Sequence, residues 1–290
     1  MARARALRWL IALAVALILP LAALLLGAGL TGRDHRAYRV LSPEDEVAVA
    51  GEVLPASLLA EHYQPHLYLR PDTPSPALMW VWYEAVPGHE GISLVYYHAW
   101  EGETNPDPGL QSLYVLFRAA YYGYPLYDIE YFQVDVSRAD GAVVGLRFEM
   151  GATDNYFALI NEHVVVRLRR QPGGTFREER YTRRGRPLGQ ADGVAPLFDG
   201  QHVRVGVQTW NHLSKLLGPA DSAYRERVTA ALRPLSDDEY SRYKFVRKSQ
   251  GDHRTRESPW TLPLATLATF VFVTLLGGVL YLLRRTAQAR

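Results

Sequence analysis

The stretch Tyr127–Val136, YDIEYFQVDV, alternates polar and apolar residues with the period of two that is typical of a β-strand. Its apolar face carries Phe132 and the two valines that follow. Because successive side chains of a strand point to opposite faces, Asp128 and Glu130 fall on that same face. Carboxyl groups turned toward a core are costly unless they are paired, hydrogen-bonded or bound to a cation. The stretch therefore predicts a strand and a candidate site together.

Similar runs surround this strand on both sides. Two hairpins are predicted, Ile129–Ser137 with Ala142–Glu149 around the Asp140-Gly141 turn, and His163–Arg169 with Thr175–Tyr181. Further strands rich in aromatic and β-branched residues are Pro65–Arg70, Leu78–Val86, Ile92–Trp100 and His202–Thr209. Short strands joined by hairpin turns predict a mainly β fold, an antiparallel β-sandwich with a few peripheral helices.

Helical patterns flank these strands. Ser42 followed by Pro43 and two acids has the pattern of a helix N-terminus, so a short helix is expected there. Helices are also expected over 222–233 and 236–247, the second of them opened by the capping box Ser236–Glu239.

The composition excludes several classes of protein. The 290 residues hold 32 Lys+Arg, 30 Asp+Glu and no cysteine, so disulfide frameworks, zinc ribbons, iron–sulfur clusters and thiol nucleophiles are excluded. The net charge of +2 argues against a nucleic-acid partner for the chain as a whole. No Gly-rich phosphate loop, G-x-S-x-G or H-E-x-x-H motif appears.

Two long apolar segments lie at the ends of the chain, Leu7–Leu30 and Thr261–Leu283. A helix needs about 20 apolar residues to cross a bilayer, so both segments predict transmembrane helices. A cleaved signal peptide is the alternative for the first segment. The second segment is flanked by residues placed like interfacial anchors, namely Trp260, Tyr281, Arg284 and Arg285.

All charges within 1–30 and 261–290 are basic, which predicts that both termini are cytoplasmic and that the central part is extracytoplasmic. The expected order is a tail and first span (1–30), a stalk with a short helix (31–60), a β-sandwich (61–220), a helical tail (221–260), a second span (261–283) and a final tail (284–290).

The carboxyl groups of Asp128 and Glu130 have candidate partners. On the strand Ile92–Trp100, the alternation turns His98 to the apolar face, and His212 follows the last strand closely enough to reach the same end. Oxygen-rich sites with few imidazoles suit calcium, magnesium or manganese better than zinc. In the alternative, the two acids lie in solvent or form ion pairs with Arg118 or Arg147.

Tyrosines crowd the segment before the same strand. Tyr122, Tyr124 and Tyr127 are candidates for stacking on sugar rings, and ordinary packing of aromatic side chains against the sheet is the alternative.

The aromatic strand ending in YYHAW at Trp100, followed by Tyr127–Val136, resembles the core of the necrosis-inducing-protein superfamily and its vacuolar-sorting relatives. These proteins carry an aromatic strand and then a G-H-R-H-D-W-E heptapeptide, which corresponds to YPLYDIE at 124–130 here. The resemblance spans about residues 60–150 and implies a β-sandwich.

In that family the acidic and histidine residues of the heptapeptide help to bind a divalent cation. Asp128 and Glu130 match the acidic positions, Pro125 and Tyr127 stand where the family has histidines, and an earlier acidic residue of the family corresponds to about Glu103. The resemblance does not imply a toxin, because a chain with two membrane anchors is poorly suited to secretion as a cytolysin.

The leading hypothesis is therefore non-enzymatic: a membrane-anchored extracytoplasmic β-sandwich that binds a partner protein or a cell-envelope ligand, with or without a structural divalent cation. One alternative is a metal-dependent hydrolase of envelope glycans or lipids, in which His98, Asp128, Glu130 and His212 hold the ion and Glu103 is the base. The other is a scaffold subunit, including a homo-oligomer, whose spans make the contacts.

Overall fold

The computed structural model describes residues 39–71, 75–89, 91–122, 127–153, 162–236, 238–239 and 274–278. The chain divides into two units, one formed by 38–253 and the other by the terminal segments 1–37 and 254–290. The strands described below all belong to the first unit, and the fold of that unit is mainly β with few helices.

The larger sheet has eight strands in the order β10-β9-β8-β7-β6-β5-β4-β15. Neighbours from β4 to β10 are antiparallel, whereas β15 runs parallel to β4. The strands are β4 (Leu78–Pro87), β5 (Gly91–Trp100), β6 (Asp128–Ser137), β7 (Val143–Gly151), β8 (His163–Arg170), β9 (Phe176–Thr182), β10 (Pro187–Val194) and β15 (Leu232–Pro234).

A smaller sheet of five strands has the order β11-β12-β3-β14, with β13 also paired to β12. Its central pair, β3 and β12, is parallel, and the other pairs are antiparallel. The strands are β3 (His66–Leu69), β11 (Phe198–Asp199), β12 (His202–Val207), β13 (Ser214–Leu216) and β14 (Glu226–Val228).

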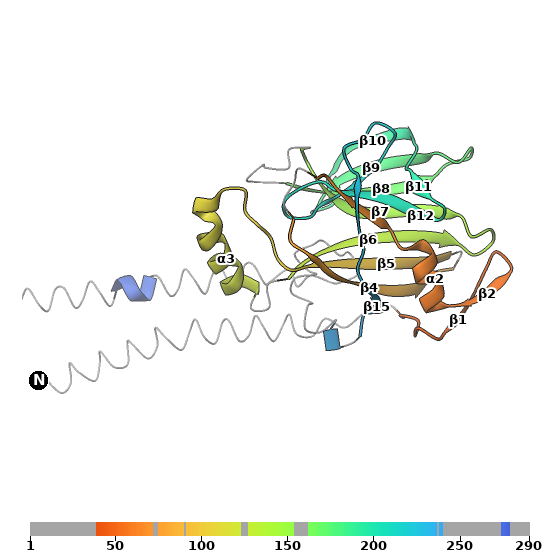
Figure 1. Ribbon diagram of the computed structural model, residues 1–290, viewed down its shortest axis with the longest axis horizontal. Helices are drawn as coiled ribbons and strands as arrows, with labels where there is room; N and C mark the ends of the chain where they lie inside the picture. The colour runs from red at the N-terminus through yellow and green to blue at the C-terminus, as the bar shows by residue number, and fades with distance from the viewer. Residues whose placement is uncertain are drawn as a thin grey trace, which may run out of the picture. The chain divides into compact units, whose positions relative to one another are not determined.

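Apolar faces of both sheets meet in one core. Leu94 and Phe132 of the large sheet belong to the same buried cluster as Leu67 and Val205 of the small sheet, and Leu59 of helix α2 (Ala56–Tyr63) completes it. These side chains are 0 to 4 % exposed, so their burial stabilises the contact between the two sheets. Figure 1 shows α2 beside the strands that it covers.

The two predicted hairpins are confirmed. The turn between β6 and β7 places Gly141 at a φ of +69°, in the left-handed region where a residue without Cβ is favoured. The hairpin of β8 and β9 uses Gly173 and Gly174 in the same way, with φ of +97° and +88°. In both cases the glycine supplies the backbone twist that the short connection requires.

The free edge of β4 is covered by two distant parts of the chain. The backbone N–H of Leu41 donates to the carbonyl of Ala85 at 2.8 Å. Beside it, β15 pairs with residues 81–83, and the N–H of Leu235 donates to the carbonyl of Tyr83 at 3.0 Å. The strand therefore presents little unpaired backbone, which protects the sheet from edge-to-edge association.

Two of the helix predictions are wrong. Residues Ser42–Asp45 form a turn in which the Asp45 carboxylate accepts the Ser42 N–H at 2.8 Å; a hairpin of β1 (Glu46–Val49) and β2 (Glu52–Pro55) follows, and the helix of this region is α2. Residues 222–233 contain β14 and most of β15 instead of a helix, because those segments complete the two sheets.

The capping box at Ser236 is confirmed at the level of its hydrogen bonds. The Ser236 side chain accepts the Glu239 N–H at 3.2 Å, and the Glu239 carboxylate accepts the Ser236 N–H at 3.2 Å. The rest of the helix expected over 236–247 lies outside the described residues.

The predicted spans, 7–30 and 261–283, also lie outside the described residues apart from a short helical segment at 274–278. In the described part of the chain, no helix combines the length and the apolar character needed to cross a membrane.

Candidate functional site

The predicted site residues of β5 and β6 come together at one end of the large sheet. In the antiparallel register, His98 stands directly opposite Glu130 and Trp100 opposite Asp128. Trp100 belongs to the core cluster, so these four side chains share the inward face, as the alternation predicted. His98, Asp128 and Glu130 are 2 to 4 % exposed, which contradicts the alternative that the acids lie in solvent.

His212 joins this group from a tight turn after β12. Its φ is +56°, an uncommon value for a residue with a side chain, and its N–H donates to the carbonyl of Thr209 at 2.9 Å. The ring donates from Nδ1 to Oδ2 of Asp128 at 2.8 Å. It also stacks on Trp100, with ring centroids 4.3 Å apart and planes inclined by 7°. The turn therefore holds the imidazole against both strands.

Burial shifts the pKa values of two groups in this cluster, Glu130 and His98. Burial, together with the nearby charges of Asp128, Glu149 and Glu103, raises the pKa of Glu130 well above its ordinary value, and Arg183 opposes this only in part. Burial lowers the pKa of His98 to about 3. Burial therefore favours the protonated form of Glu130 and the neutral form of His98.

Three nitrogen atoms of the cluster are buried without a hydrogen-bond partner in the described part of the chain: Nε2 of His98, Nε2 of His212 and Nε1 of Trp100. Such atoms are rare in folded proteins, and each costs about 1–3 kcal/mol. The inward face of β5 and β6 thus has unused hydrogen-bonding capacity at the same end as the two acids.

A second polar cluster on the neighbouring strands was missed in the sequence. The side chain of Glu149 on β7 is fully buried and accepts hydrogen bonds from Nδ1 of His163 at 2.6 Å and from the Arg183 guanidinium at 2.8 Å. Nε2 of His163 lies 3.5 Å from the Asn211 amide, beside His212. The charges of Glu149 and Arg183 act on Glu130, so the two clusters are electrostatically linked. Only the β7–β8 register reveals this pairing.

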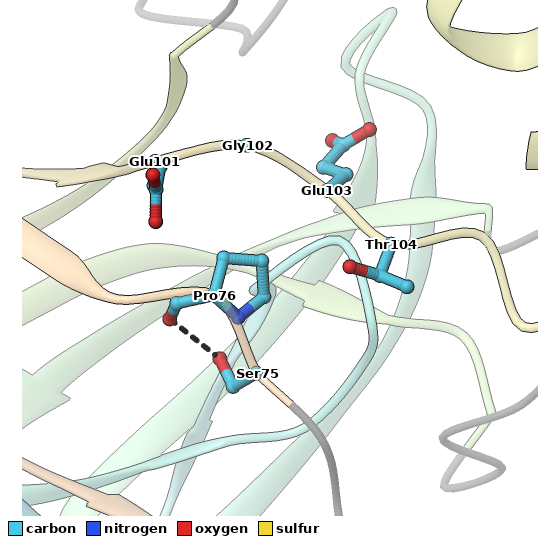
Figure 2. Close-up of a pocket in the computed structure, with 6 residues that line it drawn as sticks. All are labelled: Ser75, Pro76, Glu101, Gly102, Glu103 and Thr104. Carbon is cyan, nitrogen blue, oxygen red and sulfur yellow. Dashed lines mark hydrogen bonds between the residues drawn. The ribbon is translucent and has the colours of Figure 1, made fainter. Parts of the chain in front are cut away.

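A pocket of about 400 Å³ opens beside the loop that follows β5. Figure 2 shows its lining: Ser75 and Pro76 from the segment before β4 lie across from Glu101–Thr104. Two acidic residues, Glu101 and Glu103, therefore belong to its lining; in Figure 2 the Glu101 side chain points toward Pro76, whereas the Glu103 side chain points away from it. Glu103 accepts a hydrogen bond from the Tyr114 hydroxyl of helix α3 (Pro108–Tyr122), which fixes the loop to that helix.

The resemblance implies a divalent cation held by the residues at this end of the sheet. Within the described ranges, no three His, Asp or Glu side chains are arranged so that they could hold a metal ion. Asp128 is already engaged by His212. The described side chains thus do not fit a closed metal centre, and the divalent cation stays a prediction.

The remaining candidate residues fall into two groups. The ring of Tyr127 packs edge-on against Trp80, with centroids 5.0 Å apart, so the packing alternative fits it better than a stacking platform. Tyr122 ends α3, and its side chain lies outside the described part. Also outside are Tyr124 and the four membrane-anchor residues Trp260, Tyr281, Arg284 and Arg285.

Comparison with known proteins gives only a distant likeness. No family model matches the chain, and no curated protein is significantly similar to it. One similar solved structure is described as NLPPya in complex with mannosamine, with 12% identity, 72% of this chain and 85% of that chain covered, and a TM-score of 0.35. Another is necrosis and ethylene inducing protein 2 from the causal agent of witches' broom disease of cocoa, with 10% identity, coverage of 71% and 86%, and a TM-score of 0.35. The chain therefore has a weak fold resemblance to the necrosis and ethylene inducing proteins, as its sequence indicated, and the likeness concerns the fold alone.

Proposed function

We propose that this chain is a membrane-anchored, extracytoplasmic binding protein of β-sandwich architecture, and that it binds a positively charged group of a cell-envelope ligand or partner protein. The binding end is the one where β5 ends and β6 begins. The pocket wall with Glu101 and Glu103 and the buried acids Asp128 and Glu130 belong to this end.

The observation that carries the proposal is the burial of the Glu130 carboxyl group among other acids. This carboxyl group is buried at the end of the inward face, directly opposite His98, and has a pKa raised by burial and by three neighbouring acids. A carboxyl group whose neutral form is favoured in this way ionises more readily when a positive charge arrives, because the charge lowers its pKa again. The site is therefore suited to exchange a proton for a cationic group.

Two kinds of ligand supply such a group, a divalent cation and an amine. The prediction of calcium, magnesium or manganese belongs to the first kind, and an amino sugar or a lysine side chain belongs to the second. The hydrolase alternative needs Glu103 as a free base, whereas Glu103 accepts the Tyr114 hydroxyl here, so the binding function has the better support.

The test is calorimetry on the full-length chain in detergent. Ca²⁺, Mg²⁺ and Mn²⁺ are titrated in turn, then glucosamine, with neutral N-acetylglucosamine as the matched control. The expected result is binding of at least one charged probe, with proton uptake by the buffer, and no binding of N-acetylglucosamine.

Two variants test whether the charged probes bind at Glu130. Glu130→Gln is expected to abolish the proton release and to weaken binding about tenfold or more, since it removes one charge-assisted contact. Glu52→Gln, an exposed acid on β2, is the control and is expected to bind as the parent does. Equal binding of charged and neutral probes, or an unchanged Glu130→Gln variant, would show that the site has another function.

A further inference from the structure

Helix α3 carries an apolar face that the body of the protein does not cover. Leu113 is 64 % exposed, the largest value among the large apolar side chains of the described residues, and Leu110 is 43 % exposed. The two are three residues apart, so they lie on one face of the helix, and Phe117 continues the spacing in the sequence. An exposed apolar stripe of this kind marks a contact surface.

An adjoining side of α3, about 100° around the helix from the Leu110–Leu113 face, is attached to the body. The Tyr114 hydroxyl donates to Glu103, and the Tyr114 ring packs edge-on against Trp210 with centroids 5.3 Å apart. The Gln111 side chain accepts the Asn105 N–H at 2.6 Å and donates to the Glu103 carbonyl at 3.3 Å. These contacts fix the rotation of the helix about its axis, with Leu110 and Leu113 turned outward. In Figure 1, α3 stands off from the sheets beyond the end of β5 and β6.

The length and charge of α3 indicate what covers this face. Its 15 residues extend about 22 Å, which is too short to cross the roughly 30 Å of hydrocarbon in a bilayer. It contains one basic residue, Arg118, and no acid, so nothing in the helix is repelled by anionic lipid headgroups. A short amphipathic helix of this type lies in the plane of the membrane interface.

The short linker between the first predicted span and the described body also indicates that a membrane covers this face. Only residues 31–38 separate the first predicted span from Arg39, and eight residues reach at most about 29 Å. If the spans anchor the chain, the body stays close to the bilayer at all times, and the effective lipid concentration at α3 is high.

We propose that α3 is a membrane-surface helix, whose Leu110–Leu113 stripe inserts into the headgroup region of the bilayer that anchors the chain. The proposal rests on the membrane anchoring proposed above. Because the N-terminal half of α3 is bonded to the Glu103 loop, insertion places the acidic pocket at the lipid surface, where it meets ligands attached to the envelope.

The test uses the absence of cysteine from the chain, which makes single-site labelling clean. Full-length Leu113→Cys and Ser112→Cys are labelled with an environment-sensitive fluorophore. Both positions are exposed on α3, and they lie about 100° apart around the helix. The variants are reconstituted into vesicles of phosphatidylcholine with a minor fraction of phosphatidylglycerol, with and without brominated acyl chains. The expected result is quenching at least about twofold stronger at position 113 than at position 112.

Equal quenching at both positions in chains that resist alkaline extraction would overturn the membrane-surface helix and leave the anchoring intact. Release of the chain by alkaline extraction would overturn the anchoring and the helix proposal with it. Oxidation of Leu113→Cys into a disulfide-linked dimer would assign the face to a second copy, which also overturns the proposal.

Discussion

Nδ1 of His212 lies 2.8 Å from Oδ2 of Asp128, although the two residues are 84 positions apart in the chain. Both side chains are nearly or fully buried, with 0 % and 6 % exposure. This single contact joins the turn after β12 to the start of β6, and so joins the smaller sheet to the site on the larger one.

Breaking this pair is expected to destabilise the protein by about 3 kcal/mol, because removal of one partner leaves a buried polar group without compensation. The measurement is urea denaturation of full-length Asp128→Asn, His212→Gln and the double variant in detergent. The double variant is expected to lose less than the sum of the two single losses. Additive losses would mean that the two side chains act independently.

His98 is expected to make the protein sensitive to acid. Its pKa is about 3 in the fold, against about 6.5 in the unfolded chain, so the unfolded state binds more protons between these values. Stability is therefore lost as the pH falls from about 6.5 to about 3, with a slope of about 1.4 kcal/mol per pH unit for this group. His98→Gln is expected to flatten the curve of stability against pH in this window. The control is His89→Gln at an exposed position, where the parent slope is expected to remain.

Glu130 acts in the opposite direction. Its pKa is raised in the fold, so the native state binds the extra proton, and this contribution is lost as the pH rises above the ordinary value of about 4.5. Glu130→Gln is expected to stabilise the protein at pH 8 and to have little effect at pH 4, as judged from denaturation midpoints at the two values. Destabilisation at pH 8 would indicate that the carboxylate has an ionic partner there.

The β6–β7 turn gives a test of the fold itself. Gly141→Ala forces a side chain into the left-handed region and places its Cβ 3.2 Å from the Tyr63 hydroxyl and 3.3 Å from Cβ of Ala50. Gly200→Ala has nearly the same φ, +66°, but open space around it. Each is expected to cost about 1 kcal/mol or more in thermal or urea unfolding, and Gly141→Ala is expected to cost more than Gly200→Ala. Equal costs would show that Tyr63 and Ala50 move aside freely.

The orientation of the chain in the membrane is expected to place its two basic ends in the cytoplasm. In sealed vesicles whose extracytoplasmic face is outward, trypsin is expected to cut the body at the exposed Arg183-Arg184 turn, whereas an epitope tag added after Arg290 is protected. Detergent is then expected to make the tag accessible. Loss of the tag in intact vesicles while the body survives would reverse the orientation.

The sequence predicted well those features that depend on neighbouring residues. Alternation along YDIEYFQVDV assigned Asp128 and Glu130 to the inward face, because the period of a strand is fixed by the backbone. The Asp140-Gly141 turn was predicted for the same reason, since few residues tolerate a positive φ.

Features that depend on distant partners could not be predicted in this way. Residues 226–234 have helical composition, yet they form strands because the edges of β3 and β4 offer backbone hydrogen bonds. The pairing of Glu149 with His163 depends on the register of β7 and β8, which are joined by a long connection. Helix α3 was missed because its glycine and tyrosines are typical of loops and strands as well.

Segments near the two ends of the described body form hydrogen bonds with the same strand, β4. Leu41 and β15 lie along the same edge of β4, at Ala85 and at Val81–Tyr83. A mechanical load applied between residue 39 and residue 239 would therefore pass through a short stretch of β4 and bypass the core and the site. Tension applied through the chain before residue 39 and after residue 239 is expected to break the backbone hydrogen bonds of Leu41 or β15 first. The positions of Asp128, Glu130 and His212 are expected to remain unchanged at that stage.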